Sequence, residues 1–230
     1  DRDDAVTDVV EGRSRTLPRI VGLAVALVLT TVVWYPPILG PLLPDGFVLR
    51  NLAQQGIDWA FTIVLVAIVL FWERLPLSSM GFEKITGETL GGGLGLGGFV
   101  MVALVVWTLA VGWLRDPSMG MGPTSGFFIW YGPLALITAG VCEEVIYRGY
   151  AMERLLRMFR SPWPALLLPH VAFSLMHIKD GWDKVLMVGT GGFLFTWWYY
   201  KSRDLTMNIV GHLFVDAMAL VGAAFGIGRD

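Results

Sequence analysis

The apolar residues of this chain of 230 residues gather in long blocks that short polar segments separate. Hydrophobic residues make up 55 % of the chain and charged residues 16 %, and the mean hydropathy is +0.62. Soluble domains carry about 25 % charged residues, whereas a block of about 20 apolar residues can cross the hydrocarbon core of a bilayer. The blocks therefore predict an integral membrane protein with one all-α domain.

The lengths of the blocks predict a polytopic bundle of about seven transmembrane helices. The expected spans are 17–35, 57–73, 88–114, 126–157, 163–178, 184–200 and 205–226. Tryptophan and tyrosine side chains lie near many of the span ends, which is typical of residues at the membrane interface.

The distribution of Lys and Arg predicts that the N-terminus lies in the cytoplasm. In that orientation the inner segments hold eleven of these residues and the outer segments five, with Arg148 left aside because it lies within a span. We expect residues 1–16 to form a flexible cytoplasmic tail and residues 17–230 to form the domain embedded in the cell membrane. The first apolar run is too long for a typical cleaved signal peptide, so we expect it to remain as an anchor.

The net charge and the single cysteine exclude several classes of protein. A net charge of −2 gives no reason to expect a nucleic-acid partner. Cys142 is the one cysteine of the chain, which excludes an internal disulfide framework and a cysteine-rich metal site.

The glycine-rich stretch GGGLGLGGF at 91–99 contains the spacing G-x-G-x-x-G that occurs in dinucleotide-binding proteins. That motif requires a preceding strand, and here the stretch opens a transmembrane run instead. Gly91 with Gly95, or Gly93 with Gly97, also has the G-x-x-x-G spacing that lets two membrane helices approach closely. We therefore expect these glycines to pack helices together.

Seven of the ionisable residues in the predicted spans are candidates for a functional site, because charge inside a membrane is costly and usually marks function. They include all three histidines of the chain. The seven residues are Glu143, Glu144, Arg148, His170, His177, His212 and Asp216. Their concentration on the fourth, fifth and seventh spans predicts a polar functional site inside the membrane domain.

The spacing of the charged residues on the fourth span divides them into two groups. Glu144 and Arg148 are four residues apart and share one helix face, so we expect an ion pair between them. Glu143 is turned by about 100° from Glu144 on an α-helix, which leaves its carboxylate freer to point elsewhere. We infer an architectural role for Glu144 and Arg148 and a chemical role for Glu143. The alternative is that all three form a satisfied structural cluster.

Two later spans supply possible partners for Glu143. FSLMH places Phe173 and His177 four residues apart, and HLFVD does the same for His212 and Asp216. Residues at this spacing share a helix face. Asp216 could therefore orient His212 or contact a ligand itself.

The depth of His177 requires a tilt or a bend in the fifth helix. On straight helices, Glu143 would lie about 20 Å and His177 about 25 Å from the inner interface. Pro164 and Pro169 lie in this helix and permit such a bend. The alternative is that His170, which shares roughly the face of His177, is the closer partner of Glu143.

The motifs EEVIYR, FSLMH and HLFVD, in this order on successive predicted membrane helices, resemble the motifs EExxxR, FxxxH and HxxxN/D of the CPBP family. This is the CaaX protease and bacteriocin-processing family, also called Abi, and the resemblance covers about residues 138–217. The family includes the eukaryotic CaaX endoprotease, a glutamate-dependent intramembrane protease without a metal. It also includes bacterial members linked to bacteriocin immunity and peptide processing.

The resemblance implies a role for each motif residue. Glu143 resembles the catalytic base that activates water, and His177 resembles its partner in holding that water. His212 and Asp216 match the pair thought to stabilise the oxyanion. The eukaryotic enzyme has Asn at the last position, whereas an ionised Asp accepts hydrogen bonds and donates none. Asp216 is therefore either protonated, or it serves by orienting and charging His212.

The expected function is metal-independent hydrolysis of peptide bonds in membrane-associated or lipidated peptides, with no cofactor. A desolvated carboxylate takes a proton from water and returns it to the leaving amine, and a histidine donor stabilises the developing negative charge. The expected partners are the lipid bilayer and a membrane-associated peptide or protein substrate.

The sequence leaves two alternative functions open. A zinc-dependent membrane protease would need a metal site such as Glu143, His177 and His212, although the chain has no HExxH motif. A non-catalytic membrane scaffold or bacteriocin-immunity protein would keep the polar core for structure alone, since a fold does not fix a function.

Overall fold

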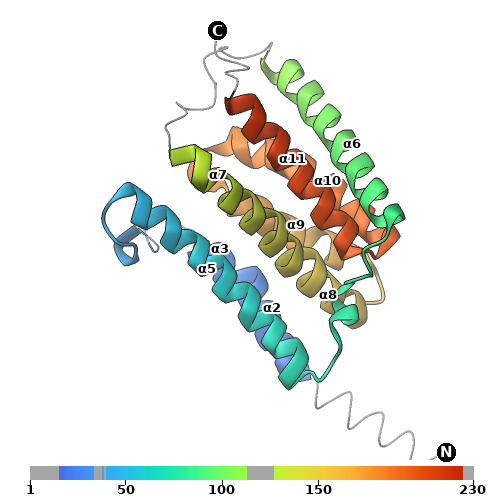
Figure 1. Ribbon diagram of the computed structural model, residues 1–230. Coiled ribbons are helices and arrows are strands. Elements are labelled where there is room, and N and C mark those ends of the chain that lie inside the picture. Colours follow the sequence, from blue (N-terminus) through green and yellow to red (C-terminus); the bar gives the residue numbers. More distant parts are fainter. Residues whose placement is uncertain (1–15, 34–37, 39, 113–126, 225–230) are drawn as a thin grey trace, which may run out of the picture.

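The computed structural model of the protein describes residues 16–33, 38, 40–112 and 127–224 (Figure 1). Within these ranges every regular element is a helix, which confirms the predicted all-α fold class. The predicted cytoplasmic tail, residues 1–16, lies outside the described residues except for Thr16.

Seven helical segments in the described part of the chain correspond to the predicted spans, and several of them join α-helical and π-helical parts in series. In chain order they are α2–η1–α3 (Thr16–Leu23, Ala24–Leu29, Thr30–Val33), α5–η3 (Phe47–Ala67, Ile68–Trp72), α6 (Gly87–Gly112), α7–η5–α8 (Phe127–Thr138, Ala139–Met152, Glu153–Met158), α9 (Trp163–Leu175), α10 (Trp182–Ser202) and α11 (Leu205–Ala224). The short 3₁₀ turns between them are η2 (Gly40–Leu42), η4 (Leu77–Met80) and η6 (Ile178–Asp180).

Four of the described segments are long and apolar enough to cross a membrane by their length and composition alone. They are Thr16–Val33, Val48–Trp72, Gly87–Val111 and Leu205–Gly222. The helix α9 is shorter and also apolar. Together with the other apolar helices, these spans make the protein an integral membrane helix bundle.

The second helix begins at Phe47, so the predicted boundary at residue 57 is wrong. The prediction followed the apolar run and treated the polar residues before it as a connection. In the structure Asn51, Gln55 and Asp58 recur at helical spacing within α5. Gln55 Nε2 donates a hydrogen bond to the Tyr131 hydroxyl of α7 at 2.8 Å. Such a partner allows a polar side chain to lie inside a membrane helix bundle.

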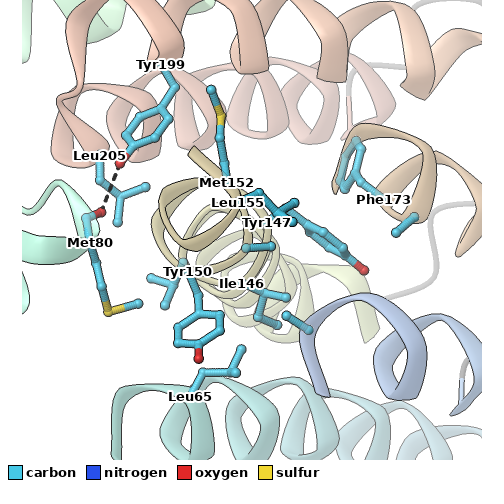
Figure 2. Packing of buried hydrophobic residues seen from close by; sticks show 14 of the residues in the cluster. Leu65, Met80, Ile146, Tyr147, Tyr150, Met152, Leu155, Phe173, Tyr199 and Leu205 are labelled. Atoms are coloured by element: carbon cyan, nitrogen blue, oxygen red, sulfur yellow. Dashed lines mark hydrogen bonds between the residues drawn. The ribbon is translucent and has the colours of Figure 1, made fainter. Parts of the chain in front are cut away.

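The segment α7–η5–α8 runs through the middle of the bundle (Figure 1). Its central part, η5, is buried at all but three of its 14 residues. Figure 2 shows why: Tyr150 points toward Leu65 of α5, whereas Tyr147 points toward Phe173 of α9 on another side of the helix. A helix that packs on several sides at once is buried rather than amphipathic, so polar groups on η5 face protein and not lipid.

Glycines let α6 and α11 pack with their backbones close together. A Cβ atom at Gly97 would lie 2.7 Å from the carbonyl oxygen of Gly211, and one at Gly93 would lie 2.6 Å from Cβ of Val210. The G-x-x-x-G prediction is thus confirmed for the pair Gly93 and Gly97. A Cβ at Gly91 would meet no described atom within 4 Å.

A buried ion pair fixes the η4 turn to the α8 end of the central helix. Arg154 donates to Glu73 at 2.7 Å and to the Ser79 carbonyl at 2.9 Å, and both charged side chains are fully buried. The Tyr150 hydroxyl donates to the second Glu73 oxygen at 2.9 Å. On the other side of the turn, the Tyr199 hydroxyl lies 3.1 Å from the Met80 carbonyl (Figure 2). These contacts anchor the central helix that carries the site residues.

Candidate active site

The carboxylate of Glu144 is the centre of a buried polar cluster. One of its oxygens, Oε1, accepts hydrogen bonds from Arg148 Nη1 at 3.1 Å and from His212 Nδ1 at 2.9 Å. The other oxygen, Oε2, accepts from Asn208 Nδ2 at 3.2 Å. The Glu144 side chain has no exposed surface. Its charge is therefore matched by protein groups on two helices, as a buried carboxylate requires.

The guanidinium of Arg148 links Glu144 to α10 and α9. Its Nη2 donates to the Gly192 carbonyl at 2.9 Å, and its Cζ lies 4.6 Å from the centre of the Phe173 ring. A Cβ at position 192 would lie 2.5 Å from that ring, so only glycine leaves room for this arrangement. The predicted ion pair between Glu144 and Arg148 is confirmed.

The imidazole of His212 points its two nitrogens at different carboxylates. Nδ1 lies against Glu144, whereas Nε2 lies 3.7 Å from Glu143 Oε2 and 3.7 Å from Asp216 Oδ2. The ring also stacks on Phe195 of α10, with 5.3 Å between centroids and 21° between planes. An ionised Glu144 can only accept, so the proton of this hydrogen bond resides on Nδ1 of His212.

Glu143 differs from Glu144 in its surroundings although the two are adjacent in sequence. The side chains of Glu143 and Asp216 are 17 % and 30 % exposed, against none for Glu144. The angle expected between the two glutamates was that of an α-helix, whereas η5 is π-helical and its turns are wider. The expected difference in direction persists: Glu144 faces Arg148 and Glu143 faces the Nε2 side of His212.

His177 lies beyond the end of α9, and not within a helix reaching residue 178 as expected. The backbone N–H of His177 donates to the Ser174 carbonyl at the end of α9, and the His177 carbonyl accepts from the Asp180 N–H in the tighter η6 turn. Its ring packs edge-to-face on Phe173 at 5.4 Å, and Nδ1 lies 3.1 Å from the Phe173 carbonyl oxygen. Because Phe173 also contacts Tyr147 and Arg148, it connects His177 to the Glu144 cluster.

His170, the alternative histidine, lies on the wall of a cavity that no other residue of the predicted site lines. That cavity of about 540 Å³ lies between α9 and α10, and its lining includes Ser174, Leu186 and Phe193. The His170 ring packs edge-to-face on Phe193 at 5.6 Å, and its buried Nδ1 has no hydrogen-bond partner among the described residues.

Two polar residues near the site were absent from the sequence prediction. Asp58 of α5 lies close enough for its charge to act on Glu143 and on Cys142. Asn208 of α11 contacts Glu144 directly. The signal for Asp58 was the helical spacing that it shares with Gln55 and other polar residues. Asn208 was overlooked because it is uncharged, although it lies one helical turn before His212.

The zinc alternative needs three ligands in one place. In the parts of the chain that the structure describes, no three His, Cys, Asp or Glu side chains are grouped so that they could hold a metal ion.

These features define a class of protein: an all-helical membrane protein with a buried polar cluster, in which the central helix supplies a glutamate and an arginine and α11 supplies a histidine. Residues 125–218 match the family model described as Type II CAAX prenyl endopeptidase Rce1-like, which is a model of the CPBP family. The match covers about two fifths of the chain and runs from α7 to α11. It confirms the resemblance that the three motifs indicated. Among the curated proteins and the solved structures, none matches the chain.

Proposed function

We propose that this protein is a metal-independent intramembrane endopeptidase in which Glu143 activates a water molecule. The observation that carries the proposal is the position of His212, whose Nε2 lies 3.7 Å from both Glu143 and Asp216 while Glu144 holds its Nδ1. A partly exposed carboxylate beside an oriented histidine is the arrangement that hydrolysis of a peptide bond needs.

In the proposed first step, Glu143 takes a proton from water and the water oxygen attacks the carbonyl carbon of the substrate. The carbonyl π electrons move to its oxygen and form the oxyanion. In the second step the C–N bond breaks, and the proton held by Glu143 passes to the leaving amine. Glu143 suits this role better than Glu144, because all the described contacts of Glu144 are to protein donors.

The tautomer of His212 determines how it can help. Because its Nδ1–H is given to Glu144, its Nε2 carries a proton only when the ring is an imidazolium. The proposed oxyanion donor is therefore doubly protonated His212. The nearby carboxylates of Glu143 and Asp216 favour that charged form. Asp216 can therefore have a function while it is ionised: its negative charge favours the imidazolium form of His212, and it does not donate to the oxyanion.

His177 is proposed to hold the attacking water together with Glu143, as the motif FSLMH implies. Two contacts orient its ring: Nδ1 lies against the Phe173 carbonyl oxygen, and the ring packs on the Phe173 side chain. A prenylated or otherwise lipidated peptide fits the matched family, whose description is a prenyl endopeptidase. The bundle spans the bilayer, so a membrane-anchored substrate would be held close to it.

The second candidate is a structural membrane protein without catalysis. The observation in its favour is that Glu144, Arg148 and His212 satisfy one another within the described residues. Such a cluster would stabilise a scaffold or an immunity protein equally well.

The test uses the full chain purified into liposomes with a library of lipidated and unmodified membrane peptides in H₂¹⁸O. We expect the wild type to release products with ¹⁸O in the new carboxyl group, with or without a strong chelator, and Glu143→Ala to release none. Glu83→Gln is the matched control, because Glu83 is an exposed carboxylate outside the site and the change should have no effect. Activity that a chelator abolishes would favour the zinc protease. A wild type that cleaves nothing would favour the structural protein.

A further inference from the structure

Asn208 is the described residue that contacts the second oxygen of Glu144. Its side chain is fully buried on α11, and Nδ2 lies 3.2 Å from Glu144 Oε2 and 3.0 Å from the Phe195 carbonyl oxygen. Both hydrogens of the amide are therefore used. The reverse orientation of the amide would place its oxygen against two acceptors, so the partners fix the orientation observed.

The contacts of Asn208 and His212 hold the two ends of one carboxylate. Asn208 binds Oε2, and His212 and Arg148 bind Oε1. The terminal torsion of a glutamate side chain is broad, so the carboxylate can rotate when one end is released. With Oε2 released, rotation would lengthen the contact between Oε1 and Nδ1 of His212, and the Nε2–H tautomer would become accessible.

Phe195 connects the same two residues from α10. Its carbonyl oxygen accepts from Asn208 and its ring stacks on the imidazole of His212. A loss of the Asn208 contact would therefore free the backbone acceptor that lies behind the stacked ring. The result is a second way in which Asn208 fixes the plane of His212.

We propose that Asn208 is a positioning residue that locks the Glu144 carboxylate and, through it, keeps the proton of neutral His212 on Nδ1. The inference rests on the proposed function for its effect on turnover, although its effect on His212 does not depend on activity. Asn208 touches neither Glu143 nor Asp216 in the described contacts, so it acts through Glu144 and not on the substrate.

The first experiment is ¹⁵N NMR of the histidine side chains of the full chain in micelles. The chain has three histidines, and a His212→Gln sample assigns the signals of His212. At a pH where the ring is neutral, we expect the wild type to show Nδ1–H, and Asn208→Leu and Asn208→Ala to show a mixture with Nε2–H. Asn208→Leu keeps the branched shape of the side chain without its donors, which keeps the test valid if the alanine variant does not fold.

The second experiment measures turnover of the same variants. Loss of a residue that orients a functional group typically costs 10–100-fold, so we expect kcat to fall about 10–100-fold with KM unchanged. Tyr150→Phe is the matched control: it loses a buried hydrogen bond to Glu73, away from His212, and should leave both kcat and the NMR signals of His212 as in the wild type.

The outcomes separate the inference from the proposed function. Unchanged His212 signals in both Asn208 variants would overturn the inference, whether or not the protein is a protease. Changed signals in a protein without any peptidase activity would leave the role of Asn208 standing and remove the proposed function.

Discussion

Replacing Arg148 by methionine should destabilise the protein strongly. The change removes the buried partner of Glu144 and leaves the Gly192 carbonyl, which accepts from Nη2 at 2.9 Å, without that donor. Breaking a buried ion pair by removing one member costs about 3–5 kcal/mol because the other charge stays buried. At about 2–4 °C per kcal/mol for a chain of this size, the melting temperature should fall by roughly 6–20 °C.

Intrinsic tryptophan fluorescence during heating in detergent micelles measures this change, with Arg160→Met as the matched control. Arg160 is exposed, so its replacement should change the free energy of unfolding by no more than about 0.5 kcal/mol. The double variant Glu144→Gln with Arg148→Met should be more stable than Arg148→Met alone, because no unpaired charge remains buried. Equal melting temperatures for the two arginine variants would refute the reasoning, as would additive effects in the double variant.

Three further predictions test helix packing, the ion pair of Arg154 with Glu73, and the last motif residue. Gly97→Val should lower the free energy of unfolding by about 1–3 kcal/mol, because it overpacks α6 against α11. Gly95→Val is the control, since a Cβ at Gly95 meets no described atom, and it should leave stability unchanged. Equal melting temperatures for the two variants would contradict this packing. Arg154→Met should lower stability by about 3–5 kcal/mol in the same thermal assay, because it leaves Glu73 buried without its partner, and a wild-type melting curve would contradict it. Asp216→Asn and Asp216→Ala should both lower kcat, since neither side chain carries the negative charge that favours the imidazolium form of His212; a wild-type kcat in Asp216→Asn would argue against this role.

Local features of the site could be predicted from the sequence. The ion pair of Glu144 and Arg148 depends on a spacing of four residues along one helix, and residues at this spacing still meet in the π-helical η5. The separation of Glu143 from its neighbour followed from the same argument. The seven helical segments followed from apolar length, although the polar residues of α5 concealed where the second one begins.

Contacts between helices could not be predicted from spacing, because a sequence does not specify how helices rotate about their axes. The sequence suggested Asp216 as the residue that orients His212, since the two are four apart on one helix. In the structure Nδ1 of His212 donates its hydrogen bond to Glu144, on a different helix. The contact of Asn208 with Glu144 could not be predicted for the same reason, because the two residues are 64 apart in the chain and lie on different helices. The end of α9 before His177 depends on the tight turn that follows it.

The central claim is that two adjacent glutamates have different functions, and one paired measurement tests it. Glu143→Gln and Glu144→Gln are compared for peptide cleavage and for melting temperature in the same detergent. We predict that Glu143→Gln loses at least about 100-fold in kcat, as expected for removal of a general base, at an unchanged melting temperature. Glu144→Gln, in contrast, should lower the melting temperature, because it leaves Arg148 buried and unpaired. A Glu143→Gln variant that cleaves at the wild-type rate would contradict the account.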